Sequence, residues 1–441
     1  MNNEIKSTIR GFTKVLIEGM CLGSIVWDEN TGLIVGVYLR EQTAPAGVIW
    51  ADGQGFEAYP AFIDGHVHDR FDESGKEDAE HLEAACIEGG VGTIMTMPNN
   101  RVPFTRLHQI AERIARWQGS RLTVRFHIGA ARDNLPVIAG LRGLKNSWLG
   151  QVKEYDASST NPSLLIDDDQ TQFRAAEAIG QSGRIKLVHA EYEPWLKRNR
   201  AQIELERELR LEEHCALRSA EVEVEGIRRA IEICRDTGVR THICHVSTWR
   251  GLELIAFAKD EGLPVTCETC PHYWRLNEHD LLTMRGRAKM NPALRSEEDM
   301  RKLEYYLCQG LVVDVVFTDH APHKKEEKAA EEYDSCPSGV PGVETVVLSV
   351  YDLKAQGKIT PARFVDLTSR NAARIFGLNK GELAEGKDAD IVLINPGQTT
   401  LFHDQNMRSK CGWTPFHGQT VRGSIAAVVL RGKVVKELQG G

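Results

Sequence analysis

The sequence predicts an α/β protein: a TIM-type (β/α)8 barrel with a small β satellite domain formed by the N- and C-terminal segments. From Ala61 onward, short apolar runs alternate with amphipathic stretches, which is the pattern of repeated βα units and a parallel sheet. Eight such runs occupy a span close to the roughly 250 residues that these barrels use. Both ends of the chain instead contain short strands separated by turns.

The two terminal segments come first in this scheme. Residues 13–58 contain apolar runs such as KVLIEG and VIWADGQG between Gly and Asn turns. After GELAEGKDADIVLINP the chain returns to β texture and finishes in SIAAVVLRGKVVKEL. We expect the two segments to pair, which gives a satellite domain of residues 1–58 and 385–441 and a barrel of residues 59–384.

The barrel strands follow in order along the chain. The eight runs are AFIDGHVH, GTIMTMPN, TVRFHIG, LGQVKEY, RIKLVHAE, RTHICHVS, PVTCETC and VVDVVFTDH. In such barrels the chemistry lies at the C-terminal ends of the strands. The segment 196–213, after the fifth run, is dense in charges of both signs. We expect a solvated helix there in preference to a partner-binding element.

Composition excludes several classes of protein. The 441 residues are 41% hydrophobic and 26% charged, which is typical of a globular protein and excludes a disordered chain or a disulfide scaffold. A net charge of −8 without a dense basic block predicts no nucleic-acid partner. The N-terminus MNNEIKSTIRGF lacks a signal-peptide core, and no run approaches the roughly 18 apolar residues of a membrane span. We therefore expect a cytoplasmic protein without membrane contact, with its ten cysteines reduced.

Five polar side chains lie near the ends of the predicted barrel strands. His66 and His68 end the first run, and because strand side chains alternate they face the same side. A His-x-His pair alone is a weak signal, but His189, His245 and Asp319 lie near the ends of the fifth, sixth and eighth runs. Imidazole and carboxylate groups suit Zn²⁺ or a similar divalent ion. Four histidines and one aspartate exceed the needs of one open catalytic site, so two metals are expected.

Lys153, at the end of the fourth run, is a candidate for the bridge between two such metals. Metals about 3.5 to 4 Å apart need a bridging anion. A lysine amine that has captured CO₂ becomes a carbamate with two ligand oxygens. A lysine at a strand end is more often solvated, and Glu154, Asp156 or the acidic run 167–169 are rival bridging carboxylates.

Motifs along nearly the whole chain resemble the dihydroorotase branch of the cyclic amidohydrolases. They are PAFIDGHVHDR, EGGVGTIMTMPNN, VHAE, HICHVST, ETCPHY, KMNPALR, FTDHAPH, GVPGVET, RNAARIFGL and TPFHGQTVRG. The resemblance implies that Lys153 is carboxylated and bridges two zinc ions. It also implies the other ligands: His66, His68 and Asp319 for one ion, and His189 and His245 for the second.

The same resemblance implies the groups that bind substrate. Arg70, Asn99 and His323 would bind the carboxylate of dihydroorotate, and Asn291 would contact the pyrimidine ring. A guanidinium suits a carboxylate because it makes two parallel hydrogen bonds. The structural alternative for Arg70 is a surface salt bridge with one of two neighbours, Asp69 or Asp72.

The activity implied is reversible hydrolysis of the cyclic amide of dihydroorotate to N-carbamoyl-L-aspartate, a step of pyrimidine biosynthesis. It would use a hydroxide held between the metals, with Asp319 as general acid and base. The alternatives are a hydantoinase, dihydropyrimidinase or allantoinase, which act on rings without a carboxylate, and a catalytically silent scaffold. The partner is then a small molecule, and the chain could form a homo-oligomer.

Two features depart from the motifs of known sites. Phe71-Asp72-Glu73 stands where relatives continue Glu-Pro-Gly after the arginine. Cys267 and Cys270 have the spacing of a metal motif, but the chain has no second pair of this kind. We expect these two cysteines to be buried thiols.

Overall fold

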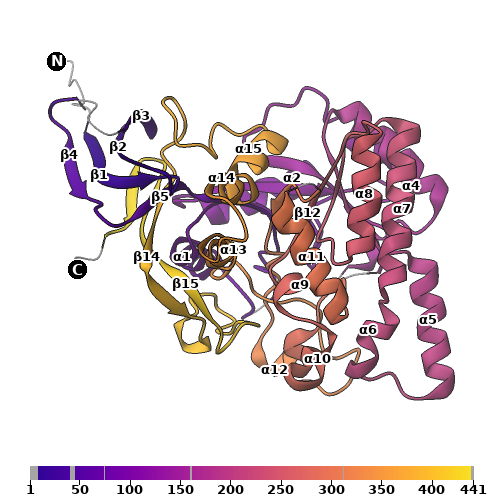
Figure 1. Cartoon of the computed structure of the whole chain (residues 1–441). Helices are drawn as coiled ribbons and strands as arrows, with labels where there is room; N and C mark the ends of the chain where they lie inside the picture. Colours follow the sequence, from indigo (N-terminus) through magenta and orange to yellow (C-terminus); the bar gives the residue numbers. More distant parts are fainter. Residues whose placement is uncertain (1–7, 40–44, 74, 159–160, 311, 439–441) are drawn as a thin grey trace.

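The computed structural model describes residues 8–39, 45–73, 75–158, 161–310 and 312–438. Residues 1–7, on which part of the signal-peptide argument rests, lie outside this range. The described chain contains two eight-stranded sheets (Figure 1). One sheet forms the barrel and the other lies beside it.

The barrel consists of parallel strands in sequence order, each beside the next along the chain. This confirms the predicted fold class, because each strand overlaps one of the eight apolar runs, and only β7 begins one residue before its run. The strands are β6 (Phe62–Val67), β7 (Val91–Thr96), β8 (Thr123–Gly129), β9 (Leu149–Tyr155), β10 (Lys186–His189), β11 (Thr241–Ile243), β12 (Val265–Thr269) and β13 (Val315–Val316).

The barrel closes where the chain beyond β13 meets β6. The hydroxyl of Thr318 donates to Asp64 Oδ2 at 2.6 Å, and the backbone N–H of His68 donates to the carbonyl of His320 at 2.7 Å. Gly65 allows the close approach inside the barrel, since a Cβ at that position would lie 2.5 Å from the Phe317 ring. Closure therefore brings the end of the first strand beside the segment that carries Asp319.

Helices cover the outside of the barrel (Figure 1). Their ends carry strong local signals: Asp168 caps α4 by accepting from the N–H of Thr171, and Thr248 caps α8 by accepting from that of Gly251. The helices are α1 (Ala79–Gly89), α2 (Leu107–Ile114), α3 (Leu135–Ala139), α4 (Asp169–Ser182), α5 (Glu193–Glu206), α6 (His214–Leu217), α7 (Ala220–Thr237), α8 (Trp249–Asp260), α9 (His272–Arg275), α10 (Glu278–Met284), α11 (Glu297–Gln309), α12 (Lys325–Lys328), α13 (Val346–Ala355), α14 (Pro361–Val365) and α15 (Asn371–Phe376). None of these described helices is both long and apolar enough to cross a bilayer.

The second sheet joins the two ends of the chain, as predicted. Its strands run in the order β16, β15, β14, β5, β1, β2, β3, with β4 paired to β1. The link between the ends is the antiparallel pair β5 and β14, in which Pro60 lies opposite Ile391. The bounds are β1 (Ile9–Ile17), β2 (Cys21–Asp28), β3 (Leu33–Leu39), β4 (Ile49–Asp52), β5 (Glu57–Pro60), β14 (Ile391–Leu401), β15 (Thr420–Leu430) and β16 (Lys433–Lys436). The domain boundaries themselves stay a prediction.

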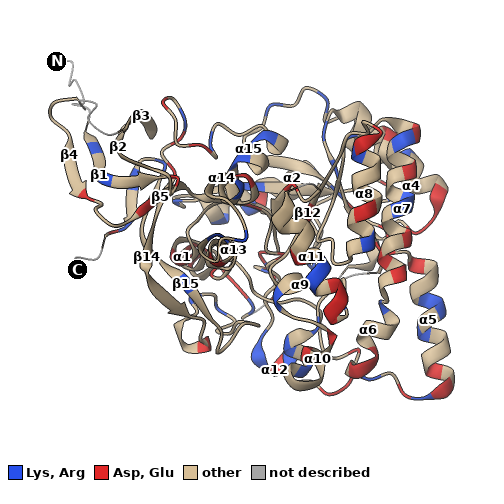
Figure 2. Ribbon diagram, viewed as in Figure 1, with Lys and Arg blue, Asp and Glu red and all other residues tan. Residues whose placement is uncertain are grey.

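The charged segment after the fifth barrel strand forms the helix α5, which carries both signs of charge (Figure 2). Leu205 on this helix is 88% exposed, as a solvated helix requires. The solvated part ends at Glu206, because Leu211 is buried in a small cluster with Leu217, Tyr333 and Cys336. Leu217, Tyr333 and Cys336 also line a surface cavity, so this segment supports the wall of that cavity.

All ten cysteines are free, and most are buried. Cys267 and Cys270 are among the buried ones, as predicted. Cys21 is exposed, because it begins β2 at the margin of the second sheet.

Candidate metal centre and substrate cavity

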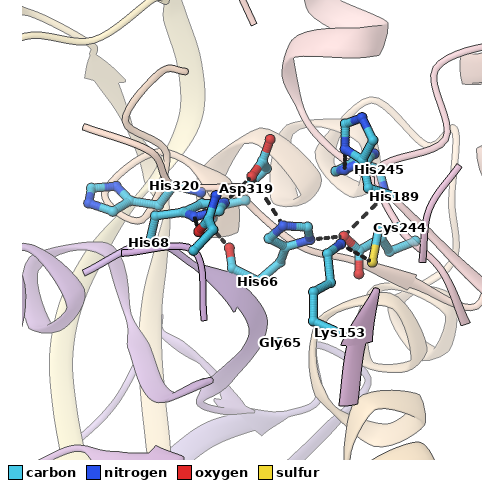
Figure 3. Close-up of polar contacts among 12 residues, drawn as sticks. Gly65, His66, His68, Lys153, His189, Cys244, His245, Asp319 and His320 are labelled. Carbon is cyan, nitrogen blue, oxygen red and sulfur yellow. Dashed lines mark hydrogen bonds and ion pairs between the residues drawn. The ribbon is translucent and has the colours of Figure 1, made fainter. Parts of the chain in front are cut away.

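His66, His68 and Asp319 form a compact cluster at the barrel mouth (Figure 3). Asp319 Oδ1 lies 3.2 Å from Nε2 of His66 and 3.0 Å from Nε2 of His68. One ligand atom from each residue lies within 4.8 Å of the others, and all three residues are buried. The alternation of β6 and the barrel closure thus place three metal-type ligands around one point.

The hydrogen bonding of His68 indicates that this cluster suits a cation. Its Nδ1 lies 2.6 Å from the amide oxygen of Asn99, which only accepts, so Nδ1 carries the proton. Burial lowers the pKa of His68 to about 4, against the opposing effect of Asp319, so the ring is neutral at pH 7. The lone pair of Nε2 then faces a carboxylate oxygen. His68 Nε2 and Asp319 Oδ1 are therefore two acceptors without a proton between them. A divalent ion bound to both atoms would stabilise this arrangement.

A second carboxylate holds the other face of His66. Glu268 Oε1 lies 2.5 Å from His66 Nδ1, and Glu268 Oε2 lies 2.9 Å from His242 Nε2. Burial alone would lower the pKa of His66, but Glu268 and Asp319 raise it to about 10. Glu268 therefore fixes which ring nitrogen of His66 points toward the cluster.

His189 and His245 form a second pair on the neighbouring strands. His189 Nδ1 lies 2.9 Å from His245 Nε2, and His189 Nε2 lies 2.7 Å from Glu191 Oε2. Arg218 also binds that Glu191 oxygen. Burial would raise the pKa of Glu191, but Arg218 and His189 lower it to about 2, so it stays ionised and accepts the Nε2 proton. Nδ1 of His189 is thereby left to face the cavity.

Lys153 lies between the two histidine groups in the interior of the barrel (Figure 3). It is fully buried, and its Nζ lies 3.0 Å from Sγ of Cys244. As an ammonium it offers no lone pair, so only a carbamate would make it a ligand. Lys153 faces inward on β9, and the adjacent Glu154 instead lies 2.7 Å from Nζ of Lys186.

The remaining rival carboxylates have partners other than the histidines. Asp167 and Asp168 both form ion pairs with Arg132, whose side chain is half-exposed. Asp156 is buried, and its pKa is raised well above the ordinary value by burial and by Glu154. None of these three aspartates lines the cavity that holds the four histidines.

The predicted substrate residues lie in two adjoining cavities. Arg70, Asn99 and Asn291 line the same cavity as the four histidines and Asp319. His323 lines a larger neighbouring cavity of about 370 Å³. The two cavities share Asn291 and Ser338, and His323 Nε2 donates to the Ser338 carbonyl, so His323 lies where the cavities adjoin.

Arg70 is buried, with 2% of its surface exposed. The surface salt bridge with Asp69 or Asp72 is wrong, because both of these carboxylates face Arg113. Arg70 Nη1 instead lies 3.1 Å from Oε1 of Glu73, and its Nε has no hydrogen-bond partner among the described residues. The guanidinium thus retains donor capacity inside the cavity.

Three of the predicted site residues have a left-handed backbone. Arg70, His245 and Asp319 have φ values of 46°, 37° and 48°. Such values are uncommon outside glycine and cost about 1–3 kcal/mol each unless the surroundings impose them. Strain of this kind concentrates at functional sites, which agrees with the position of these residues at the cavity.

Sequence reasoning missed several groups around the cluster. Glu268 was available as a signal, since it is a charged residue inside the otherwise apolar run PVTCETC. Tyr155 lies two positions after Lys153 on the same face of β9. It lines the cavity that holds the four histidines and Asp319, which we call the metal cavity. Its hydroxyl has no hydrogen-bond partner within the described part of the chain. Glu191 in LVHAE and Cys244 in HICHVS gave no sequence signal beyond their nearness to histidines.

Comparisons with known proteins agree with this geometry. The amidohydrolase family model matches residues 58–435. A dihydroorotase from Pelobacter propionicus is 32% identical over 92% of this chain and 95% of its own length. An allantoinase from Rubrobacter xylanophilus is 30% identical over 88% of this chain and 85% of its own.

A solved structure gives the same result for the fold. The L-hydantoinase from Arthrobacter aurescens superposes with a TM-score of 0.90 at 26% identity, over 98% of this chain and 96% of that one. The relatives thus act on different cyclic amides. The chain belongs to the amidohydrolase family and is a cyclic amidohydrolase.

Proposed function

We propose that this enzyme is a dihydroorotase, which interconverts dihydroorotate and N-carbamoyl-L-aspartate. One observation carries the proposal: the buried guanidinium of Arg70 lies in the same cavity as the metal-type ligands. A charged group in a desolvated cavity is costly unless a partner binds it. A substrate that carries a carboxylate next to its scissile amide supplies that partner.

The proposed metal ligands are His66, His68 and Asp319 for one divalent ion, His189 and His245 for the other, and carboxylated Lys153 for both. Such a pair of ions, when bound, supplies a nucleophile from water at neutral pH and polarises the amide carbonyl. The facing acceptors of His68 and Asp319 support the first ion. The converging nitrogens of His189 and His245 support the second, with the carbamate as the additional ligand.

Asp319 is the proposed proton carrier. Burial would raise its pKa, but His66 and His68 lower it to about 2, so it is a carboxylate at neutral pH. Oδ1 faces both imidazoles, which leaves Oδ2 to accept the proton of the attacking water. The same oxygen then delivers the proton to the departing ring nitrogen, and ring closure reverses the order.

The substrate groups divide between the two cavities. Arg70 and Asn99 are proposed to bind the substrate carboxylate, and Asn291 the ring. His323, at the junction of the cavities, is proposed to complete the carboxylate site. The free hydroxyl of Tyr155 can donate a hydrogen bond to a ring oxygen, because it has no other partner among the described residues.

Glu73 favours a second candidate, hydrolysis of a neutral ring such as allantoin. Its carboxylate already lies 3.1 Å from Arg70, so part of the guanidinium charge is neutralised before substrate binds. The allantoinase and hydantoinase relatives agree with this candidate.

Side-by-side turnover of dihydroorotate, allantoin, hydantoin and dihydrouracil by metal-loaded protein tests the proposal. A dihydroorotase gives the largest kcat/KM with dihydroorotate and also forms the ring from N-carbamoyl-L-aspartate. A larger kcat/KM with allantoin would replace the proposal by the second candidate.

A further inference from the structure

Lys328, at the end of α12, is a buried lysine whose hydrogen bonds within the described residues all go to main-chain oxygens. Its Nζ donates to the carbonyls of Lys289 at 2.9 Å, Pro337 at 2.7 Å and Gly339 at 2.9 Å. Only 2% of its surface is exposed. An ammonium has three N–H donors, so all of them are used.

A second buried lysine acts on the same stretch of chain. Lys289 Nζ donates to the carbonyls of Tyr333 and Cys336, both at 2.6 Å, and lies 3.7 Å from the centre of the Tyr333 ring. Neither Lys289 nor Lys328 forms an ion pair with a carboxylate of the described chain. Burying an ammonium without a counter-ion is costly, so these lysines are held by the carbonyl dipoles that they bind.

The chain that the lysines bind, residues 333–339, forms part of the wall of the metal cavity. Ser338 and Gly339 line that cavity together with the metal-type ligands. His323 Nε2 donates to the carbonyl of Ser338 at 3.0 Å, and Ser338 lies between Pro337 and Gly339, two of the three residues whose carbonyls bind Lys328. The 333–339 segment therefore connects the lysines to both substrate cavities.

The fit of this wall is tight at Gly339. Its backbone φ is +133°, a value that residues other than glycine rarely adopt. A Cβ at this position would lie 2.7 Å from both Cβ and the carbonyl oxygen of Ala321, two residues after Asp319. A small displacement of the segment would thus change the space available to a ring bound at Asp319.

We propose that Lys328 is a positioning residue for substrate: its ammonium, together with Lys289, fixes the main chain of residues 337–339 as the wall against which the cyclic amide binds. The inference rests on the proposed function only in requiring that a small ring occupies the metal cavity. Lys328 touches neither the metal-type ligands nor the reacting atoms. Its loss should therefore weaken substrate binding more than it slows the chemical step.

Kinetics of Lys328→Met, a neutral side chain of similar length, test the proposal. Loss of the charged hydrogen bonds should raise KM about ten- to a hundredfold. We expect kcat and metal content to stay near the wild-type values. The matched control is Lys325→Met on the same helix, whose half-exposed Nζ lies 3.8 Å from Asp404 and which should keep the wild-type KM.

Hydrogen exchange gives a readout that needs no substrate. In metal-loaded Lys328→Met, amides of residues 333–339 should exchange faster than in the wild type, while those of β6 and β10 should not. An unchanged KM with unchanged exchange in this segment overturns the proposal. A fall in kcat at constant KM also overturns it, because Lys328 would then act on the chemistry.

Two further arms keep the test decisive. If Lys328→Met does not fold, Lys328→Arg keeps the charge but moves the donors, and an unchanged KM for that variant overturns the proposal. The assays use whichever of dihydroorotate and allantoin the wild type hydrolyses. If the wild type hydrolyses only allantoin, the dihydroorotase assignment is refuted. The role of Lys328 is then still tested, because KM for allantoin can be compared between the wild type and the variants.

Discussion

Glu268 Oε1 lies 2.5 Å from Nδ1 of His66, although the two residues belong to the seventh and first strands of the barrel. The carboxylate accepts the Nδ1 proton and so directs Nε2 of His66 toward Asp319. Its other oxygen is held by His242. The orientation of a ligand on one strand is thus set from a strand that supplies no proposed ligand of its own.

We expect Glu268→Gln to lower metal affinity about 10- to 100-fold, the usual effect of losing a carboxylate behind a histidine ligand. The amide is close in size to the carboxylate, so the barrel should remain folded. Competition with a chelator measures the affinity. The control is Glu261→Gln, a half-exposed residue after α8 that should leave the affinity unchanged, and an unchanged affinity in Glu268→Gln would contradict the orienting role.

Lys153→Ala should remove the carbamate and weaken both ions, since the adjacent carboxylate of Glu154 is held by Lys186 and does not take its place. Intact mass of the wild type under native conditions should include one added CO₂ that the variant lacks. Short carboxylic acids in the buffer should restore part of the activity by entering the gap. Lys302→Ala, an exposed change on α11, serves as control, and two retained metals with a normal rate in Lys153→Ala would refute the bridge.

The fold was predictable because its signals are local. Buried parallel strands are continuous apolar runs, and each of the eight runs overlaps one strand. The alternation of His66 and His68 likewise follows from strand geometry alone. The side chains that come together at the barrel mouth could be predicted for the same reason, since all lie at the ends of strands.

Contacts between distant segments could not be predicted in this way. The link of Glu268 to His66 depends on how the seventh strand faces the first, which no local pattern encodes. The choice of Glu73 over Asp69 and Asp72 as the partner of Arg70 depends on the position of Arg113 in a later helix. The burial of Leu211 likewise depends on the distant segment that contains Tyr333.

Glu344 should make stability depend on pH. Burial raises its pKa to about 7, against the lowering effect of the backbone N–H groups of Arg408 and Ser409. Between the ordinary glutamate value of 4.5 and about 7, the folded state holds a proton that the unfolded state has released. Stability therefore falls as pH rises through this window, by at most about 3 kcal/mol.

Urea unfolding at pH 5 and pH 8 measures this effect. Glu344→Gln should remove that part of the decrease, because its side chain is neutral at both pH values. Its single amide oxygen keeps one of the two backbone bonds, since the N–H groups of Arg408 and Ser409 bind different oxygens of Glu344. The half-exposed Glu88→Gln is the control. A Glu344→Gln curve parallel to that of the wild type would mean that Glu344 is ionised at pH 5 already.

Arg70→Ala separates recognition of the substrate carboxylate from the chemistry. The variant leaves that carboxylate without its charged partner in a desolvated cavity, a loss of about 2–5 kcal/mol in kcat/KM for dihydroorotate. The activity on dihydrouracil, which has no carboxylate, should stay nearly unchanged, as should the metal content. The control is Arg301→Ala, which removes an exposed arginine of α11.

Glu73→Gln tests the same role of Arg70 from the other side, because Glu73 accepts a hydrogen bond from the Arg70 guanidinium in the absence of substrate. Removing its charge frees the guanidinium and relieves repulsion of an anionic ring, so KM for dihydroorotate should fall while KM for dihydrouracil stays constant. Opposite changes in Arg70→Ala and Glu73→Gln, confined to the anionic ring, would establish Arg70 as the carboxylate receptor. Equal losses on both rings in Arg70→Ala would instead mean that the arginine supports the cavity itself, and the choice of dihydroorotate over allantoin would lose its chemical basis.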